Sequence, residues 1–264
     1  MKVLCELTVS ENRRLNDDTW LMALAVPPEA ADVLSEVRAG RFVMLRCAES
    51  GDLHFRRPFS FASVDRLAGT FTLCYKVVGD QTRALSACTR GEKLSGLLPL
   101  GNTFTLPTEK VPLVLVAGGV GVVPLLLLAK ELAPREHEPP QLYLGGGTVS
   151  DLMLDHVGGF PVRMRVATED GSHGFQGTVV EMLASDRLPP DAHVYACGPK
   201  PMLQALLAAL PENVPVEASL EEVMACGIGA CYGCAVRTDG LGMDAVKLVC
   251  RDGPVFNLRR LRFD

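Results

Sequence analysis

The chain has 264 residues, a length typical of about two domains with enough core to fold without disulfide bonds. Apolar residues make up 48% and charged residues 22%, which is a globular composition and excludes a disordered chain. With 26 Lys and Arg against 31 Asp and Glu, the net charge of −5 offers no broad basic face to nucleic acid or anionic lipid.

The nine cysteines are the unusual part of the composition. They are too dilute, and odd in number, for the disulfide scaffold of a small secreted protein. Charged residues interrupt the first fourteen positions, so this segment does not have the apolar core of a signal peptide. We therefore expect a cytoplasmic location, where clustered thiols usually bind metal.

The first hundred residues are predicted to be rich in β-strands. Apolar or alternating runs recur at residues 3–9, 20–26, 41–47 and 70–78, separated by turn-forming residues. This spacing is typical of a small antiparallel barrel or sandwich. Within it, the arginine of R-P-F-S (57–60) can pair with pyrophosphate, and V-G-D-Q-T (78–82) resembles a turn that opens a phosphate-binding helix. Each signal is weak alone, because Arg57 also suits an ordinary surface position.

From residue 111 onward, apolar strands alternate with helices. Strands are predicted at 111–117, 141–144, 162–167, 192–196 and 214–219, and helices at 124–132, 179–184 and 201–210. This alternation predicts a parallel sheet that is covered on both faces. Residues 111–129 carry no charge and are long enough to span a bilayer, but glycine and proline interrupt them, so strand, turn and helix fit better.

Glycine or acidic residues follow four of these strands. They are Gly118-Gly119-Val120-Gly121, Gly145-Gly146-Gly147, Glu169-Asp170 and Cys197-Gly198-Pro199. Ligands of open α/β sheets bind beyond the carboxyl ends of the strands, so the four ends together predict a nucleotide site. Glu169 and Asp170 would accept a ribose hydroxyl and repel a 2′-phosphate, which favours NAD over NADP. For the first of the four segments, residues 118–121, a tight turn that serves only packing remains the alternative to a phosphate-binding turn.

Four of the cysteines form a cluster near the C-terminus. Their spacing, C-x4-C-x2-C and then a distant cysteine, is typical of plant-type [2Fe–2S] sites. Glycines in the loop leave backbone N–H groups free to point at sulfur, and a hairpin of strands 235–238 and 245–250 would return the last cysteine. A four-thiolate zinc site and unliganded core cysteines remain alternatives, although zinc ribbons usually carry two separate cysteine pairs.

Taken together, these motifs resemble the ferredoxin–NADP reductase superfamily over essentially the whole chain. The motifs that show this resemblance are R-P-F-S, A-G-G-V-G-V-V-P-L, C-G-P-K-P-M and C-G-I-G-A-C-Y-G-C with C-R-D-G-P-V-F. The last pair is similar to the electron-transfer subunits of type 1B dihydroorotate dehydrogenases. The resemblance implies a multidomain β plus α/β fold: an antiparallel FAD-binding β-barrel (1–107), a parallel-sheet NAD-binding domain (108–216) and a small [2Fe–2S] domain (217–264).

The resemblance also implies binding residues for each group. Those for FAD are Arg57, Pro58, Phe59, Ser60, Cys74, Tyr75, Lys76, Gln81 and Thr82. Those for NAD are Gly118, Gly119, Gly121, Cys197, Gly198 and Pro199, and the cluster ligands are Cys226, Cys231, Cys234 and Cys250. Gln81 stands where the family commonly has glycine, so strain is expected if the turn requires a positive φ there.

The function implied is electron transfer in pyrimidine biosynthesis. Dihydroorotate would be oxidised at FMN on a separate catalytic subunit, in a heterotetramer with two copies of each chain. Electrons would pass through [2Fe–2S] and FAD to NAD⁺, so no catalytic acid or base is expected in this chain, and neither nucleic acid nor membrane is an expected partner. Alternatives are a reductase subunit serving a hydrogenase, sulfite reductase or ferredoxin:NADP oxidoreductase, and a zinc-stabilised binding module. The histidines show no ligand spacing: His54, His137, His156, His173 and His193.

Overall fold

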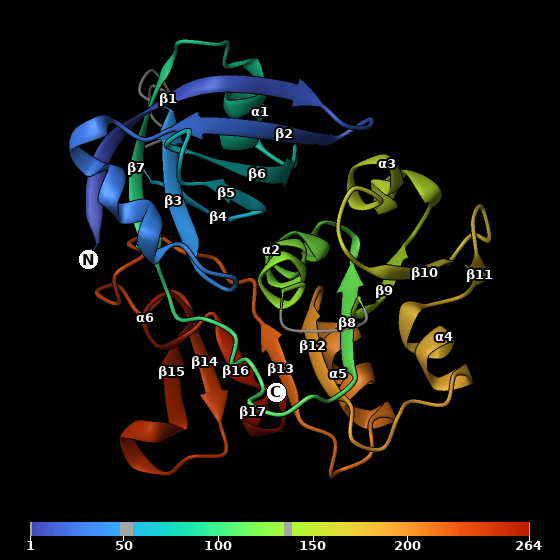
Figure 1. Cartoon of the computed structure of the whole chain (residues 1–264). Helices are drawn as coiled ribbons and strands as arrows, with labels where there is room; N and C mark the ends of the chain where they lie inside the picture. The colour runs from blue at the N-terminus through green and yellow to red at the C-terminus, as the bar shows by residue number, and fades with distance from the viewer. Residues whose placement is uncertain (1, 48–54, 135–138, 264) are drawn as a thin grey trace.

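The computed structural model describes residues 2–47, 55–134 and 139–263, and its strands form three sheets (Figure 1). His54 and His137 lie outside the described residues. The expected combination of an antiparallel barrel, a parallel sheet and a small C-terminal part is confirmed.

The N-terminal sheet is antiparallel throughout and has the order β4-β3-β7-β1-β2-β6-β5. It curls until its edge strand β4 lies against β6, which closes it into a barrel. The sequence pattern did not predict β7 or the 3-10 helix η1. The elements are β1 (Val3–Arg14), β2 (Thr19–Ala25), η1 (Pro28–Glu36), β3 (Phe42–Cys47), β4 (Arg57–Ser60), β5 (Ser63–Asp65), β6 (Thr70–Lys76), α1 (Asp80–Ala87) and β7 (Lys93–Leu100).

The second sheet has the order β11-β10-β9-β8-β12-β13-β16 and is parallel except for β16, which runs antiparallel to β13. Its strands are β8 (Leu113–Gly118), β9 (Gln141–Gly146), β10 (Arg163–Thr168), β11 (Phe175–Gln176), β12 (His193–Cys197), β13 (Val216–Ser219) and β16 (Val255–Asn257). Its helices are η2 (Gly119–Gly121), α2 (Val122–Leu132), η3 (Val149–Leu152), α3 (Leu154–Val157), α4 (Val179–Ser185) and α5 (Lys200–Ala209).

Alternate residues of β8 pack into different cores. Leu115 belongs to a cluster shared with α2 and the barrel, whereas Val114 and Val116 belong to a cluster shared with α4 and α5. Since successive side chains of a strand point to opposite faces, the sheet is covered on both faces, as predicted. None of the described helices is both long and apolar enough to cross a bilayer.

The third sheet has the order β15-β14-β17 and contains the expected hairpin of β14 with β15. The predicted second strand, however, ends at Leu248, and Cys250 lies on the short helix α6. The Asp252 carboxylate accepts a hydrogen bond from the Leu248 N–H at 2.8 Å and turns the chain there. The elements are β14 (Ala235–Thr238), η4 (Gly242–Ala245), β15 (Val246–Leu248), α6 (Val249–Asp252), η5 (Leu258–Arg260) and β17 (Leu261–Arg262).

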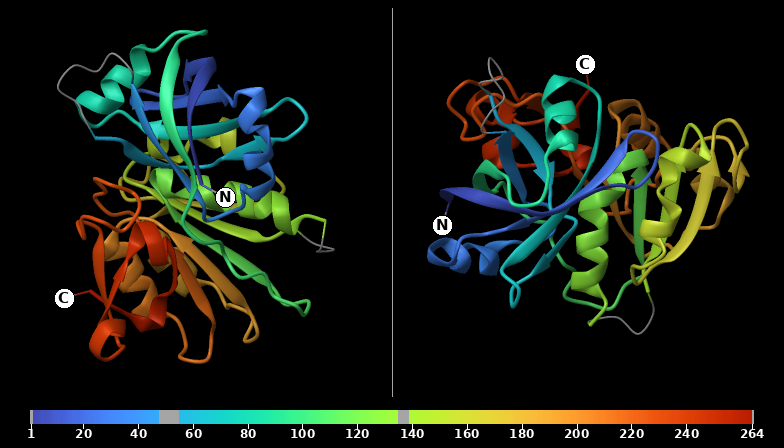
Figure 2. Two further views of the ribbon diagram at one scale, coloured as in Figure 1. Left: turned by 90° about the vertical axis from the view of Figure 1, so that its left-hand side faces the viewer. Right: turned by 90° about the horizontal axis from the view of Figure 1, so that it is seen from above.

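The C-terminal part is interlocked with the nucleotide sheet. Residues after 220 lie beside the last strands of that sheet in both views of Figure 2, and β16 from this part pairs with β13. The predicted domain boundary after residue 216 falls inside β13. Leu248, Val249 and Leu258 share one buried cluster with α4 and α5. The cysteine loop therefore leaves the sheet after β13, and the chain returns to the same edge as β16.

Candidate functional site

A cavity of about 520 Å³ lies where the three parts of the fold meet. One wall comes from β4, β6 and the turn into α1, a second from η2 and α2, and a third from residues 219–222 at the end of β13. Its volume is within the usual range for cofactor sites. All nine residues predicted to bind FAD line this cavity: Arg57, Pro58, Phe59, Ser60, Cys74, Tyr75, Lys76, Gln81 and Thr82.

Strand β4 brings an arginine and an aromatic side chain to the cavity. Arg57 is the first residue of β4 and pairs with Leu45 of β3. The Phe59 ring meets the Tyr75 ring edge to face, with 5.8 Å between centroids, which forms an aromatic wall of the cavity. Within the described residues no carboxylate pairs with the Arg57 guanidinium, so its donors suit an anionic ligand.

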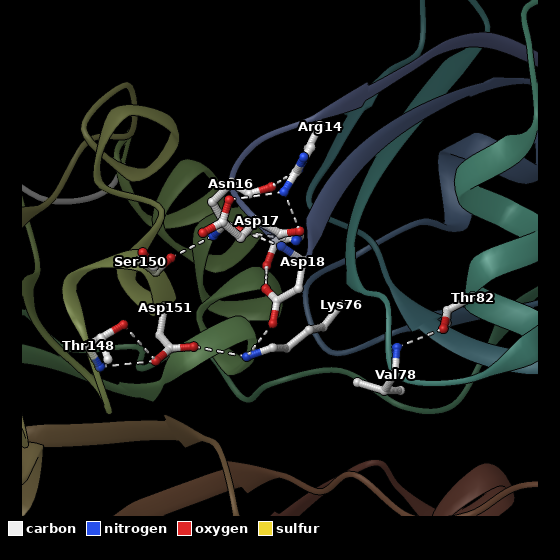
Figure 3. Close-up of polar contacts among 11 residues, drawn as sticks. Arg14, Asn16, Asp17, Asp18, Lys76, Val78, Thr82, Thr148, Ser150 and Asp151 are labelled. Atoms are coloured by element: carbon white, nitrogen blue, oxygen red, sulfur yellow. Dashed lines mark hydrogen bonds and ion pairs between the residues drawn. The ribbon is translucent and has the colours of Figure 1, made fainter.

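Thr82 shapes the turn that opens α1. Its Oγ1 accepts a hydrogen bond from the Val78 N–H at 2.9 Å (Figure 3). It also accepts one from the Gly79 N–H at 3.1 Å and donates to the Gly79 carbonyl at 3.0 Å. The hydroxyl hydrogen is thus already used inside the turn. An anion at this end of α1 would be bound by the N–H groups of the first helical turn, which have no carbonyl partner within the helix.

Gln81 has ordinary helical backbone, so the turn does not require a positive φ there and the condition for strain is not met. In the described chain the non-glycine residues with positive φ are Met153 and Tyr232. Gly79 takes the extended N-cap position, so α1 has begun before residue 81 is reached. The buried Gln81 side chain donates from Nε2 to the Phe55 carbonyl at 2.9 Å and ties the chain before β4 to α1.

We expect Gln81→Gly to lower the melting temperature by several degrees rather than relieve strain. Glycine costs about 1 kcal/mol in a helix interior, and the lost amide hydrogen bond contributes about 1 kcal/mol more. Thermal unfolding would measure this, with Arg83→Gly on the exposed face of α1 as the comparison, which tests the helix effect together with the loss of an exposed pair with Asp80. A Gln81→Gly protein more stable than wild type would contradict the relaxed backbone seen here.

The two motifs predicted for the dinucleotide lie side by side. Strands β8 and β12 are parallel neighbours that pair Ala117 with Cys197, so the residues after them meet at one sheet edge. A Cβ on Gly121 would lie 2.5 Å from the Cys197 carbonyl oxygen, and Gly119 has a φ of +53°, so both positions require glycine. The residues brought together are Gly118, Gly119, Gly121, Cys197, Gly198 and Pro199.

A carboxylate at this edge was not predicted. Glu221 follows β13, lines the cavity, and lies 4.0 Å from the Cys197 sulfur. Burial raises the pKa of Glu221, and burial followed by the nearby Glu221 charge raises the pKa of the Cys197 thiol well above its ordinary value. Burial also raises the pKa of Cys74 to about 12, so both cysteines are neutral thiols near pH 7. The rule that ligands bind at strand ends, applied to β13, would have found Glu221.

The four cysteines of the C-terminal loop lie as two pairs. Cys226 is hydrogen-bonded with Cys231, and Cys234 with Cys250. Within the described residues, no three ligand-type side chains form one ready-made metal group. A four-cysteine [2Fe–2S] cluster takes two thiolates on each iron, so this pairing has the donor set that such a cluster uses.

Backbone N–H groups point at these sulfurs. Cys226 Sγ accepts a hydrogen bond from the Ala230 N–H at 3.3 Å, and Cys234 Sγ accepts one from the Cys250 N–H at 3.4 Å. Burial alone would raise the pKa of Cys226, but hydrogen bonds from the loop backbone outweigh it and lower the pKa to about 6. Thiolate is the form that binds iron, so the loop favours the ligand state of Cys226.

Known proteins resemble this chain in both sequence and fold. A family model described as the iron-sulfur cluster binding domain of dihydroorotate dehydrogenase B matches residues 221–262. The chain is 38% identical over 234 residues to the dihydroorotate dehydrogenase B (NAD(+)) electron transfer subunit of Desulforamulus reducens, covering 86% of this chain and 88% of that protein. The protein of the same name from Bacillus caldolyticus is 38% identical over 255 residues, 95% of each chain.

Solved structures support the fold. A structure of the NADH-dependent reduced ferredoxin-NADP oxidoreductase, described in connection with flavin-based electron bifurcation, matches with a TM-score of 0.83 and 28% identity over 98% of this chain and 90% of that one. A ferredoxin NADP+ reductase from Neisseria gonorrhoeae with bound FAD and NADP matches with a TM-score of 0.66 and 17% identity over 82% of this chain and 99% of that one.

Proposed function

We propose a route for electrons on the premise that the chain belongs to the family of dihydroorotate dehydrogenase B electron transfer subunits. The chain is thus an oxidoreductase subunit, and in our proposal it passes electrons from dihydroorotate oxidation on a catalytic partner to NAD⁺ during pyrimidine biosynthesis. The observation that supports the proposal most strongly is that one cavity is lined by three elements. They are the R-P-F-S strand β4, the glycine turn η2 with the start of α2, and the segment that leads from β13 into the cysteine loop.

The barrel wall of the cavity is proposed to bind FAD. Arg57 would pair with its pyrophosphate, the first turn of α1 would donate N–H groups to phosphate, and Phe59 and Tyr75 would face the flavin ring. Pro58, Ser60 and Cys74 would line the same ring, with Cys74 as a neutral thiol. Gln81 would hold the strand and the helix together rather than contact phosphate through a special backbone.

The glycine turn η2 and the neighbouring end of β12 are proposed to bind NAD. The close backbone approach at Gly121 and the positive φ of Gly119 leave a surface without side chains at this edge. Such a surface lets the backbone come near a dinucleotide. Glu169 and Asp170 follow β10, which is separated from β8 by β9 in the sheet. Their negative charges would repel the 2′-phosphate of NADP, which favours NAD.

The cysteine pairs are proposed to bind a [2Fe–2S] cluster, Cys226 and Cys231 on one iron and Cys234 and Cys250 on the other. When bound, FAD exchanges hydride with NAD and single electrons with such a cluster, and the protein supplies position and electrostatics. The role of the loop backbone is to donate N–H groups to sulfur, which tunes the reduction potential.

The exposed side of the cysteine loop is proposed to contact the catalytic subunit. Three large apolar side chains there are exposed: Val223 at 82%, Ile228 at 52% and Tyr232 at 61%. Apolar side chains left in water beside a redox site suit a protein interface. We propose that this partner carries FMN and that two copies of each subunit assemble into a heterotetramer. The cytoplasmic location remains a prediction.

A second candidate is a reductase subunit that serves another NAD(P)H-linked complex. It is favoured by the likeness to the NADH-dependent reduced ferredoxin-NADP oxidoreductase, which extends over 98% of this chain. Under this alternative the same cofactors would be present, but electrons would come from a donor other than dihydroorotate, such as ferredoxin, hydrogen or sulfide.

Co-expression with the catalytic subunit separates these functions. We expect a complex whose visible spectrum contains flavin and iron–sulfur bands and which reduces NAD⁺ when dihydroorotate is added. NAD⁺ reduction with reduced ferredoxin or hydrogen, and none with dihydroorotate, would establish the second candidate instead. A colourless chain that holds one zinc and no flavin would overturn both and leave a zinc-stabilised binding module.

A further inference from the structure

A three-residue ionic bridge joins the barrel to the nucleotide domain. Lys76, the last residue of β6, has its Nζ 2.9 Å from Asp18 Oδ2 in the barrel and 2.9 Å from Asp151 Oδ1 in η3 (Figure 3). The two carboxylates hold the ammonium from opposite domains, and hydrogen bonds to Asp151 and Asp18 raise the pKa of Lys76. Burial alone would raise the pKa of Asp151, but hydrogen bonds, chiefly the one from Lys76, lower it, so this ammonium and this carboxylate are both charged near neutral pH.

The barrel side of the bridge is rigidly arranged by its own loop. Asn16 Oδ1 accepts hydrogen bonds from the N–H groups of Asp18 at 3.1 Å and Thr19 at 2.8 Å. The Val77 N–H donates to the Asp18 carbonyl at 2.7 Å, which fixes this loop to the end of β6. The Asn16 amide then donates to the Ser150 carbonyl at 2.6 Å, directly beside Asp151. The barrel thus contacts η3 at two adjacent residues.

The other side of the bridge belongs to the loop that follows β9. Asp151 Oδ2 accepts a hydrogen bond from the Thr148 N–H at 3.1 Å, so one carboxylate both closes this loop and pairs with Lys76. The loop starts where β9 ends, and η3 lies against the glycine turn η2. Its Val149 N–H donates to Ser172 Oγ at 2.9 Å, which connects it to the acidic loop after β10. Residues 148–152 therefore lie between the glycine turn η2 and the acidic loop after β10, beside the proposed NAD site.

We propose that Asp151 is a positioning residue for the nicotinamide dinucleotide. Through Lys76 it fixes residues 148–152 against the barrel, and so sets the position of η3 against the glycine turn to which the dinucleotide is proposed to bind. The bridge is partly exposed, with side-chain exposures of 37% for Lys76 and 26% for Asp151, so it adjusts a loop and does not hold the domains together. The inference rests on the proposed function, because it assumes that NAD binds at this edge.

The test compares Asp151→Asn with Asp17→Asn in the full-length, FAD-loaded protein. Asp17 lies in the same loop as Asp18, is 93% exposed and pairs with Arg14, so its replacement removes the same charge without touching the bridge. We expect Asp151→Asn to weaken NAD⁺ binding in isothermal titration calorimetry about three- to five-fold, the effect of losing a partly exposed ion pair. The KM for NADH in dye reduction should rise equally, with kcat and FAD content unchanged.

Asp151→Glu keeps a carboxylate for Lys76 and is expected to restore most of the NAD⁺ affinity. This rescue separates positioning by charge from a general loss of folding, which thermal unfolding of each variant monitors. Unchanged NAD⁺ affinity in Asp151→Asn, or an equal loss in Asp17→Asn, would overturn the positioning role while leaving the proposed function intact. A wild-type protein that binds FAD but no NAD⁺ or NADH would instead overturn the NAD site, and the role of Asp151 with it.

Discussion

Replacing Cys231 with serine is expected to abolish the iron–sulfur absorbance and to lower electron delivery from the catalytic subunit by at least about a hundred-fold. Cys231 is the exposed member of the pair with Cys226, so the substitution removes a thiolate without opening a buried core. NADH-driven dye reduction should continue near the wild-type rate, because the cavity and the glycine turn contain no residue of this pair.

Cys5→Ser is the matched control for this experiment, since Cys5 is a half-buried free thiol on β1 in the barrel. It should leave the visible spectrum and both activities intact. Visible spectroscopy, iron analysis and the two assays measure the outcome. Loss of dye reduction in Cys231→Ser with FAD still bound would contradict the order in which NADH, FAD and the cluster are connected.

Replacing Arg57 with alanine is expected to weaken FAD binding by about ten- to a hundred-fold, because a hydrogen bond to a charged group contributes about 1.5–3 kcal/mol. Arg57 lines the cavity from β4, and the first turn of α1 lines the same cavity, so a cation and a helix N-terminus both reach this space. Fluorescence titration of the apoprotein with FAD measures the change. Arg57→Lys keeps the charge but loses the planar fork, so an intermediate affinity is expected.

Arg90→Ala provides the comparison for Arg57→Ala, because Arg90 is an exposed barrel arginine that does not line the cavity. Its FAD affinity should equal that of wild type. If dialysis removes no more FAD from Arg57→Ala than from Arg90→Ala, the flavin phosphate lies elsewhere.

The parts of the fold that the sequence predicted are those with strong local patterns. The apolar strands β8 and β12 and the glycines after them are recognisable without neighbours, and both lie where expected. Strand β7 was missed because Gly96 and Pro99 interrupt its pattern. In the structure a Cβ on Gly96 would lie 2.4 Å from the Leu7 side chain, so the interruption is a packing requirement imposed by β1.

The residues of the candidate site likewise differ in whether a local sequence pattern predicts them. The motif residues are predictable because each follows a strand or opens a helix, and the structure places all nine flavin candidates around one cavity. The sequence left the backbone of Gln81 open, because the start of α1 depends on Gly79 and on the Thr82 capping bonds. The bridge of Lys76 with Asp151 joins residues 75 positions apart in different domains, so no local pattern could indicate it.

Strand β16 fixes the cysteine loop to the rest of the chain. The cysteine loop leaves the nucleotide sheet after β13 and the chain returns to it as β16, where the Asn102 amide exchanges hydrogen bonds with the backbone of Val255 at 2.8 and 2.9 Å. The loop is thus anchored at both ends and to the barrel linker, unlike a carrier domain on a flexible tether. A redox group held there is a stationary relay, and turnover needs no swinging arm between the partner and the flavin.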